Sequence, residues 1–281
     1  MKITSIPAVA ELLKDALQED AGGGDITTLS TIPADAAAHG RYIAKEDGVL
    51  CGMDVVRAVF DLLDPTIALT VHVAEGAHYK KGDVLAEVTG NAQNVLTGER
   101  VGLNLLQHMS GIATATAKAV AAVEGYRSKI TDTRKTTPGL RHLEKYAVRV
   151  GGGVNHRFNL SDGVLIKDNH IVAAGGITAA VRAAKAAAPH TLKIEVEVEN
   201  EERLTEALDA GADIIMLDNM DCAAMTAAVA LVDGRALTEA SGNMGERNLT
   251  EVAATGVDLI SIGALTHTVH AMDISLKFRL V

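Results

Sequence analysis

The chain has 281 residues and a net charge of −10, from 36 Asp and Glu against 26 Lys and Arg. The length allows one large domain or two unequal ones, and the acidic balance argues against nucleic acid as the main partner. No apolar run approaches the length of a membrane span, and charges from Glu11 onward come too early for a signal peptide. Two cysteines, Cys51 and Cys222, are too few for a disulfide framework, so we expect a cytoplasmic, reduced protein with no membrane partner.

The N-terminal part of the chain predicts a small sheet with helices and carries no strong chemical motif. Apolar residues recur at helical spacing over residues 1–20, and Asp25-Ile26-Thr27-Thr28 is typical of a capped turn. Alternating patterns and turn residues indicate strands further on. The predicted elements are one or two strands over 41–52, a helix over 53–63, a strand over 67–73 and a turn, strand and turn over 76–88.

A long helix is predicted next, over residues 91–109. Its apolar face carries Val101, Leu105 and Met109, and a polar stripe carries Arg100, Asn104 and Gln107. Such a stripe usually faces solvent, and a binding role is the open alternative. Ser110-Gly111 then separates this helix from an Ala-rich one over 115–123.

From residue 129 onward strand and helix patterns alternate, which predicts parallel strands joined by right-handed crossovers. Six strands fall short of a complete eight-stranded barrel. The expected fold class is therefore α/β, an incomplete, open TIM-like barrel over 115–267 with an N-terminal α/β sandwich domain over 1–114, which the alternating tail 268–281 rejoins. Strands are expected near 129–133, 163–167, 192–198, 213–217, 236–240 and 258–262, and helices near 138–150, 177–188, 201–210, 221–232 and 247–254.

A basic island lies between Thr131 and Ile171, inside an otherwise acidic chain. Its economical use is to hold a small, multiply negative ligand. Part of the island follows predicted strands, where a barrel builds its active site; for the part on a predicted helix, a solvated helix face is the alternative. The strand-end group is Arg134, Lys135, His156, Arg157 and Lys167, and the helical group is Arg141, His142, Lys145 and Arg149.

Acidic side chains end the later strands. Glu195 and Glu197 share one face of a strand, and Asp218 and Glu239 end the next two. Such acids can hold the water ligands of Mg²⁺ or ribose hydroxyls, and buried ion pairs with Lys167 or Lys193 are the alternative. Two small-residue loops follow the last strands, where barrels bind phosphate through backbone N–H groups. These loops contain Ser241, Gly242 and Asn243, and Ser261 and Gly263.

Three of these segments resemble the signature blocks of the quinolinate phosphoribosyltransferase family, also called nicotinate-nucleotide pyrophosphorylase (carboxylating). They are DTRKTTPGLR, KYAVRVGGGVNHR and LIKDNHI; GDITT and SGIAT resemble two further blocks. The resemblance implies transfer of phosphoribosyl from phosphoribosyl pyrophosphate to quinolinate, with release of pyrophosphate and CO₂. The product is nicotinate mononucleotide, in the biosynthesis of NAD. It also implies Mg²⁺ and a head-to-tail homodimer with shared active sites, with a hexamer possible.

The resemblance also implies roles for individual residues. Arg134, His156, Arg157, Lys167 and a neighbour's Arg100 would hold the two substrate carboxylates. Lys135 would serve the pyrophosphate, and Glu197 and Asp218 would contact the ribose, stabilise its cationic transition state and hold Mg²⁺, directly or through water. The expected catalytic set is thus Lys135, Glu197 and Asp218. The remaining substrate-binding residues are Ser241, Gly242, Asn243, Ser261 and Gly263.

Three other functions compete with this one. A paralogue associated with molybdenum uptake departs in the NHR and IKDNH blocks, which this chain keeps. A phosphoribosyltransferase for a monocarboxylate such as nicotinate needs fewer cations than the island supplies. A non-catalytic phosphate-binding module needs neither the acids nor most of the bases. An assay for release of pyrophosphate distinguishes such a module from an enzyme.

Overall fold

The computed structural model describes residues 2–281, in two compact units. Of the described residues, the first unit contains 2–117, 137–152 and 269–281, and the second contains 118–136 and 153–268. Met1, which falls within the first predicted helix, lies outside the described residues. The predicted division placed all of 115–267 in one domain, whereas the segment 137–152 here clusters with the first unit. Among residues 2–281, no helix has both the length and the hydropathy needed to cross a bilayer.

The first unit is built on a four-stranded antiparallel sheet of order β12-β1-β5-β3. Its last strand comes from the C-terminal tail and pairs with β1 from Ala38↔Leu280 to Ala44↔Ile274, as the alternating pattern predicts. A two-stranded ribbon joins β2 (Gly48–Val49) to β4 (His78–Tyr79). The four strands are β1 (Ala37–Ala44), β3 (Ala68–Val71), β5 (Val84–Asn91) and β12 (Ile274–Leu280).

One face of this sheet forms a core with two helices. Tyr42 and Leu85 of the sheet, Phe60 of α3 and Leu106 of α4 are all buried in one cluster, because alternate strand residues point to the same face. Asp25 begins α2 by accepting a hydrogen bond from the Thr28 N–H at 3.0 Å. The helices are α1 (Pro7–Ala21), α2 (Ile26–Thr31), α3 (Met53–Leu63), α4 (Ala92–Ala122) and α5 (Arg141–Val150), after a 3₁₀ turn at Ile3–Ser5.

The predicted break at Ser110-Gly111 is wrong, because α4 runs continuously from Ala92 to Ala122. A Cβ atom at Gly111 would lie 2.1 Å from the His270 carbonyl oxygen, and the buried Ser110 hydroxyl accepts a hydrogen bond from the Cys51 N–H at 3.0 Å. Small residues here permit close packing instead of ending the helix.

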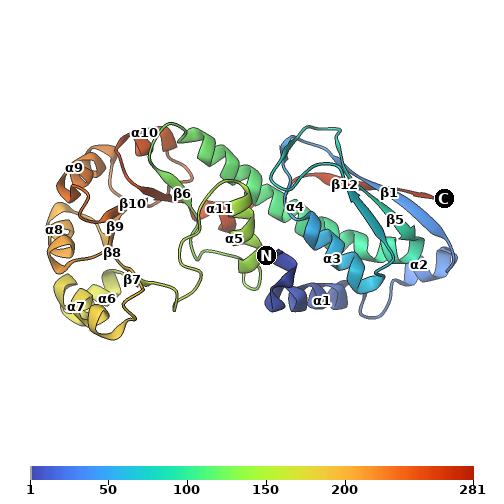
Figure 1. The fold of residues 1–281 in the computed structure, drawn as a ribbon, viewed down its shortest axis with the longest axis horizontal. Helices are drawn as coiled ribbons and strands as arrows, with labels where there is room; N and C mark the ends of the chain where they lie inside the picture. The colour runs from blue at the N-terminus through green and yellow to red at the C-terminus, as the bar shows by residue number, and fades with distance from the viewer. Residues whose placement is uncertain (1) are drawn as a thin grey trace. The chain divides into compact units, whose positions relative to one another are not determined.

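The second unit contains a parallel sheet of order β6-β11-β10-β9-β8-β7. Its two edge strands, β6 and β7, do not pair with each other, so the predicted incomplete barrel is confirmed. Helices α7, α8 and α9 lie outside strands β7 to β10 (Figure 1). The strands are β6 (Lys129–Thr131), β7 (Val164–Ile166), β8 (Ile194–Val198), β9 (Ile214–Asp218), β10 (Leu237–Ser241) and β11 (Leu259–Ser261). The helices are α6 (Asp168–Ala174), α7 (Ile177–Ala187), α8 (Glu201–Ala210), α9 (Cys222–Val232), α10 (Leu249–Ala254) and α11 (Ala264–His267).

The register of the parallel strands brings their carboxyl ends to one edge. Glu197 pairs with Met216, and Ser241 pairs with Asp218. Apolar residues of the strands, such as Ile215 and Leu217, are fully buried and form the core of this unit. The polar residues at the strand ends are therefore collected on one side of the sheet.

Candidate active site

A pocket of about 840 Å³ lies at the carboxyl ends of the strands of the second unit. Its volume suits a ligand of drug or nucleotide size, and every residue that lines it belongs to the second unit. The structure thus brings together all the predicted site residues except Arg100. Those in the pocket wall are Arg134, Lys135, His156, Arg157, Lys167, Glu197, Asp218, Ser241, Gly242, Asn243, Ser261 and Gly263.

Two guanidinium groups make one wall of the pocket positive. Burial and the neighbouring charge of Arg134 lower the pKa of Arg157. The Arg157 Nη1 group donates to the Gly163 carbonyl at 2.8 Å, whereas the buried Nε of Arg134 has no hydrogen-bond partner among the described residues. An anion that accepts hydrogen bonds from both guanidinium groups would stabilise the two adjacent cations and use the free buried donor.

The fully buried Asp132 holds the segment that carries Arg157. Its carboxylate accepts from the Asn155 amide at 2.5 Å and from the His156 backbone N–H at 2.9 Å. Sequence reasoning did not select Asp132, although it stands two residues before Arg134 at the end of β6. Charge-assisted bonds to a buried carboxylate fix the direction in which the segment enters the pocket.

Both ring nitrogens of His156 contact protein groups. The Arg157 backbone N–H donates to His156 Nδ1 at 2.8 Å, so the ring hydrogen belongs on Nε2. That nitrogen lies 3.0 Å from an oxygen of Glu195 and 3.7 Å from one of Glu239. The imidazole therefore lies between the Arg157 backbone and two buried acids.

The acid pair is itself desolvated. Glu195 and Glu239 are 4% and 1% exposed, and each has one buried oxygen without a hydrogen-bond partner. Burial and the nearby Glu195 charge raise the pKa of Glu239 to about 7. Since like charges in an apolar setting cannot both ionise easily, the pair keeps one proton into the neutral pH range.

Among residues 2–281, one group of three possible metal ligands is compact, and it is His156, Glu195 and Glu239. His156 Nδ1 already accepts from the Arg157 N–H, so Nε2, which faces Glu195, is the ring nitrogen that this group offers to a metal. The predicted metal residues lie outside this group. Glu197 forms an ion pair with Lys167, and Asp218 accepts from the Asn219 amide at 2.7 Å.

The predicted phosphate loops have a backbone that only small residues allow. Gly242 has φ +96°, and a Cβ atom there would lie 2.2 Å from Asn219 Oδ1. At Gly263 a Cβ atom would lie 3.0 Å from Cδ of Lys135, and the Thr266 hydroxyl donates to the Lys135 carbonyl at 2.8 Å. The loop after β11 therefore holds Lys135 close to its own backbone.

Other pocket residues were missed by sequence reasoning, including Asn219, Glu246 and His267. Asn219 directly follows Asp218 and could have been found from that neighbour, whereas Glu246 and His267 stand beyond the small-residue loops. Of the basic island, the helical group Arg141, His142, Lys145 and Arg149 lies on α5, in the first unit. Arg100 is exposed on α4, also in the first unit.

Comparison with known proteins places this site in a family. Residues 25–110 match the quinolinate phosphoribosyl transferase N-terminal domain, and residues 112–277 match the C-terminal domain of the same family. Together the two matches span most of the chain. The C-terminal match contains every residue of the pocket wall.

Named relatives agree with the domain matches. The chain is 47% identical over 270 residues to a probable nicotinate-nucleotide pyrophosphorylase [carboxylating] of Bacillus subtilis (strain 168), covering 96% of this chain and 93% of that protein. It is 46% identical over 275 residues to the nicotinate-nucleotide pyrophosphorylase [carboxylating] of Mycobacterium leprae (strain TN), covering 96% of each. The solved structure of the nicotinate-nucleotide pyrophosphorylase from Francisella tularensis superimposes with a TM-score of 0.94 at 40% identity, covering 99% of each chain.

Proposed function

The chain belongs to the quinolinate phosphoribosyltransferase family, and we propose which of its residues carry each part of that family's reaction. The enzyme transfers phosphoribosyl from phosphoribosyl pyrophosphate to quinolinate with decarboxylation, giving nicotinate mononucleotide, pyrophosphate and CO₂ in NAD biosynthesis. The observation that carries the assignment of residues is the pair Arg134 and Arg157, with its unused buried donor.

Arg134, Arg157 and Lys167 bind the two carboxylates of quinolinate. The depressed pKa of Arg157 supports this role, because a dianion between the two guanidiniums would offset their repulsion. Planar guanidinium groups also suit two-point contacts with a carboxylate. Lys167 is paired with Glu197 in this structure, so substrate binding would exchange that partner for a substrate carboxylate.

His156 acts on substrate through its neighbour. With Nδ1 accepting from Arg157 and Nε2 directed at Glu195, the ring keeps the Arg157 backbone in place. This role differs from the direct carboxylate contact that the family resemblance implies. The two roles predict different effects of a His156 substitution on stability.

Lys135 and the two small-residue loops bind the phosphates of the donor. Lys135 lies against Gly263, and the loop after β10 has left-handed backbone at Gly242 and Asn243. Backbone N–H groups in such loops, together with one mobile ammonium, form the usual phosphate cradle of barrels.

Glu197 and Asp218 face the ribose. When pyrophosphate leaves, positive charge develops on the sugar, and a carboxylate close to that centre stabilises it. The pyridine nitrogen then forms the new bond to the sugar. The adjacent carboxylate leaves as CO₂ from the cationic ring, and the electron pair that remains on that ring carbon takes up a proton from solvent. No step of this sequence needs a general base from the protein.

Mg²⁺ is the proposed cofactor, and the donor set fits it. Glu197 and Asp218 each offer a carboxylate oxygen with no recorded partner within residues 2–281, and oxygen ligands, often through water, are those Mg²⁺ prefers. When bound, the ion neutralises charge on the pyrophosphate leaving group.

The proposed assembly is a cytoplasmic homodimer in which Arg100 of one protomer completes the pocket of its partner. Arg100 is exposed, and its side chain has no ion pair or hydrogen bond within the described residues. A C₂ pair creates two such sites, and a hexamer made of three pairs keeps them.

Incubation with quinolinate, phosphoribosyl pyrophosphate and Mg²⁺ tests the function, with CO₂ and nicotinate mononucleotide as the measured products. Nicotinate is the control substrate, because it lacks the second carboxylate that the cations hold. We expect kcat/KM for quinolinate to exceed that for nicotinate by at least about a hundredfold, as expected for two lost charge-assisted bonds. Equal values would contradict the assignment, and no turnover would favour a binding module.

A further inference from the structure

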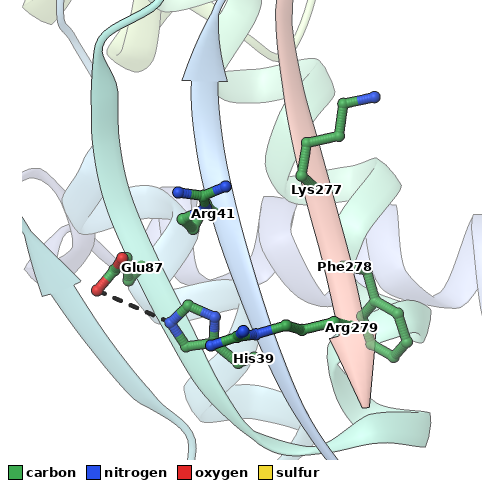
Figure 2. Close-up of a pocket in the computed structure, with 6 residues that line it drawn as sticks. All are labelled: His39, Arg41, Glu87, Lys277, Phe278 and Arg279. Atoms are coloured by element: carbon green, nitrogen blue, oxygen red, sulfur yellow. Dashed lines mark ion pairs between the residues drawn. The ribbon is translucent and has the colours of Figure 1, made fainter. Parts of the chain in front are cut away.

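A second groove lies on the open face of the sheet in the first unit. It has a volume of about 280 Å³ and is lined by strands β1, β5 and β12 (Figure 2). The sheet buries Tyr42 and Leu276 on its other face. The residues next to them along β1 and β12, Arg41 and Lys277, therefore point to the open face. The lining residues are His39, Arg41, Glu87, Lys277, Phe278 and Arg279.

Strand register places like charges directly opposite each other in this groove. Arg41 of β1 pairs with Lys277 of β12, and these two carry like charges; the imidazole of His39 stands opposite Arg279. Like charges across neighbouring strands destabilise a sheet. The side chains cannot turn to the other face without a register shift that would expose the core, so this repulsion is a fixed feature of the folded sheet.

One acid, Glu87, faces these charges, and the register of β1 and β5 places it directly opposite Arg41. Glu87 is the one acid in the groove, and its carboxylate lies 3.8 Å from His39 Nε2 and 3.5 Å from His72 Nε2. Within residues 2–281, the side chains of Arg41, Lys277 and Arg279 make no recorded ion pair or hydrogen bond. Figure 2 shows the Arg279 side chain extending from β12 toward His39, and Arg41 on the strand between Glu87 and β12.

We propose that this groove binds a doubly charged phosphate group, from free phosphate or from a phosphomonoester. Two guanidinium groups and one ammonium group around the groove offer N–H donors in several directions. A tetrahedral oxyanion can accept hydrogen bonds from all of them at once. The protein as a whole has a charge of −10, so three unpaired cations at one place are a local feature. The groove belongs to the first unit, whereas every residue of the candidate active-site wall belongs to the second.

His39 and His72 provide a local reporter, because both contact Glu87 at the edge of the groove. The full-length protein is labelled at histidine, and the ring signals are followed by NMR as inorganic phosphate replaces chloride at constant ionic strength. We expect the signals of His39 and His72 to shift along a saturating curve. A parallel titration with glycerol 2-phosphate identifies the source, since the tighter ligand of the two is the form that the groove prefers.

Three variants and one control predict the direction in which phosphate affinity changes. Arg279→Gln and Lys277→Gln each remove one unpaired cation from an exposed strand and should weaken phosphate binding about tenfold. Glu87→Gln removes the one negative charge and should tighten it. Lys14→Gln removes a cation on α1, outside the groove, and should change nothing. All four should keep the kcat and KM of the wild-type enzyme.

Thermal unfolding in phosphate-free buffer shows that each variant is folded before titration. Signals that move linearly, without saturation, in the wild-type protein would overturn the proposal. So would an affinity that Arg279→Gln and Lys277→Gln leave unchanged. Either result would mean that Lys277 and Arg279 serve to prevent edge-to-edge pairing of β12, which is the outer strand of its sheet.

Discussion

The backbone N–H of Arg157 donates to Nδ1 of His156, the residue that precedes it in the chain, at 2.8 Å. This bond assigns the ring hydrogen to Nε2, which faces the buried carboxylate of Glu195 at 3.0 Å. One imidazole therefore connects the backbone of Arg157, a proposed substrate-binding residue, to the buried acids of strands β8 and β10. A direct bond from the ring to substrate would break one of these two contacts.

His156→Ala tests the positioning role. The variant leaves the Arg157 N–H without its acceptor and the two buried acids without their common partner. We expect the free energy of unfolding to fall by about 1–3 kcal/mol, the usual cost of an unpaired buried group, measured by urea unfolding without ligands. kcat/KM should fall as well. If the variant loses activity with no loss of stability, His156 contacts substrate directly.

Glu239→Gln tests the shared proton. Its folded pKa of about 7 lies above the ordinary value of 4.5, so between these values the folded state binds more protons than the unfolded state. Stability supplied by neutral Glu239 is thus present below pH 4.5 and is lost as pH rises toward 7. The uncharged variant should not show this loss.

The measurement is urea unfolding from about pH 5 to about pH 8. Relative to wild type, Glu239→Gln should gain stability with rising pH, by at most about 3 kcal/mol. Glu199→Gln is the matched control, because Glu199 follows β8 of the same sheet and is exposed; its difference from wild type should stay flat. A flat difference for Glu239→Gln would mean that Glu239 ionises normally.

Arg134→Lys tests the geometry of the carboxylate site. The substitution keeps the charge and removes the Nε donor, which is buried and unpaired in the ligand-free protein. We expect kcat/KM for quinolinate to fall about tenfold or more, equivalent to one lost charge-assisted bond. Arg182→Lys, on the exposed side of α7, is the control. Unchanged kinetics in folded Arg134→Lys would show that charge alone is needed there.

Removal of divalent metal tests the cofactor. EDTA should abolish turnover and excess Mg²⁺ should restore it, because the leaving pyrophosphate needs its charge neutralised. Thermal unfolding without substrates should be unaffected by EDTA, since Glu197 is already paired with Lys167. Full turnover in the chelator would remove Mg²⁺ from the mechanism.

Mixing two inactive variants tests the shared site. Arg100→Ala and Lys167→Ala, exchanged between dimers, should give mixed dimers with one pocket that carries both defects and one that carries neither. Activity should recover to about a quarter of the wild-type value, because about half the dimers are mixed and each has one intact site. Mixed dimers that form and remain inactive would place Arg100 in the pocket of its own chain.

The sequence by itself determined the fold class and the side of the sheet that carries the site. Strand and helix periods are local properties, and crossovers between parallel strands bring every strand end to one edge. Residues that follow a strand therefore meet in space wherever they stand in the chain. Strand ends therefore predicted the position of Arg134, Lys135, Glu197 and Asp218, the family resemblance singled them out, and the four line one pocket.

Only the tertiary structure decided what depends on residues distant in sequence. The continuity of α4 through Gly111 depends on the close approach of the His270 backbone. The contact of His156 with two acids depends on strands β8 and β10, which contribute those acids, and the like-charge groove depends on the pairing of Arg41 with Lys277. Close packing, desolvation and strand register are set by the folded arrangement, so no local pattern of residue types contains them.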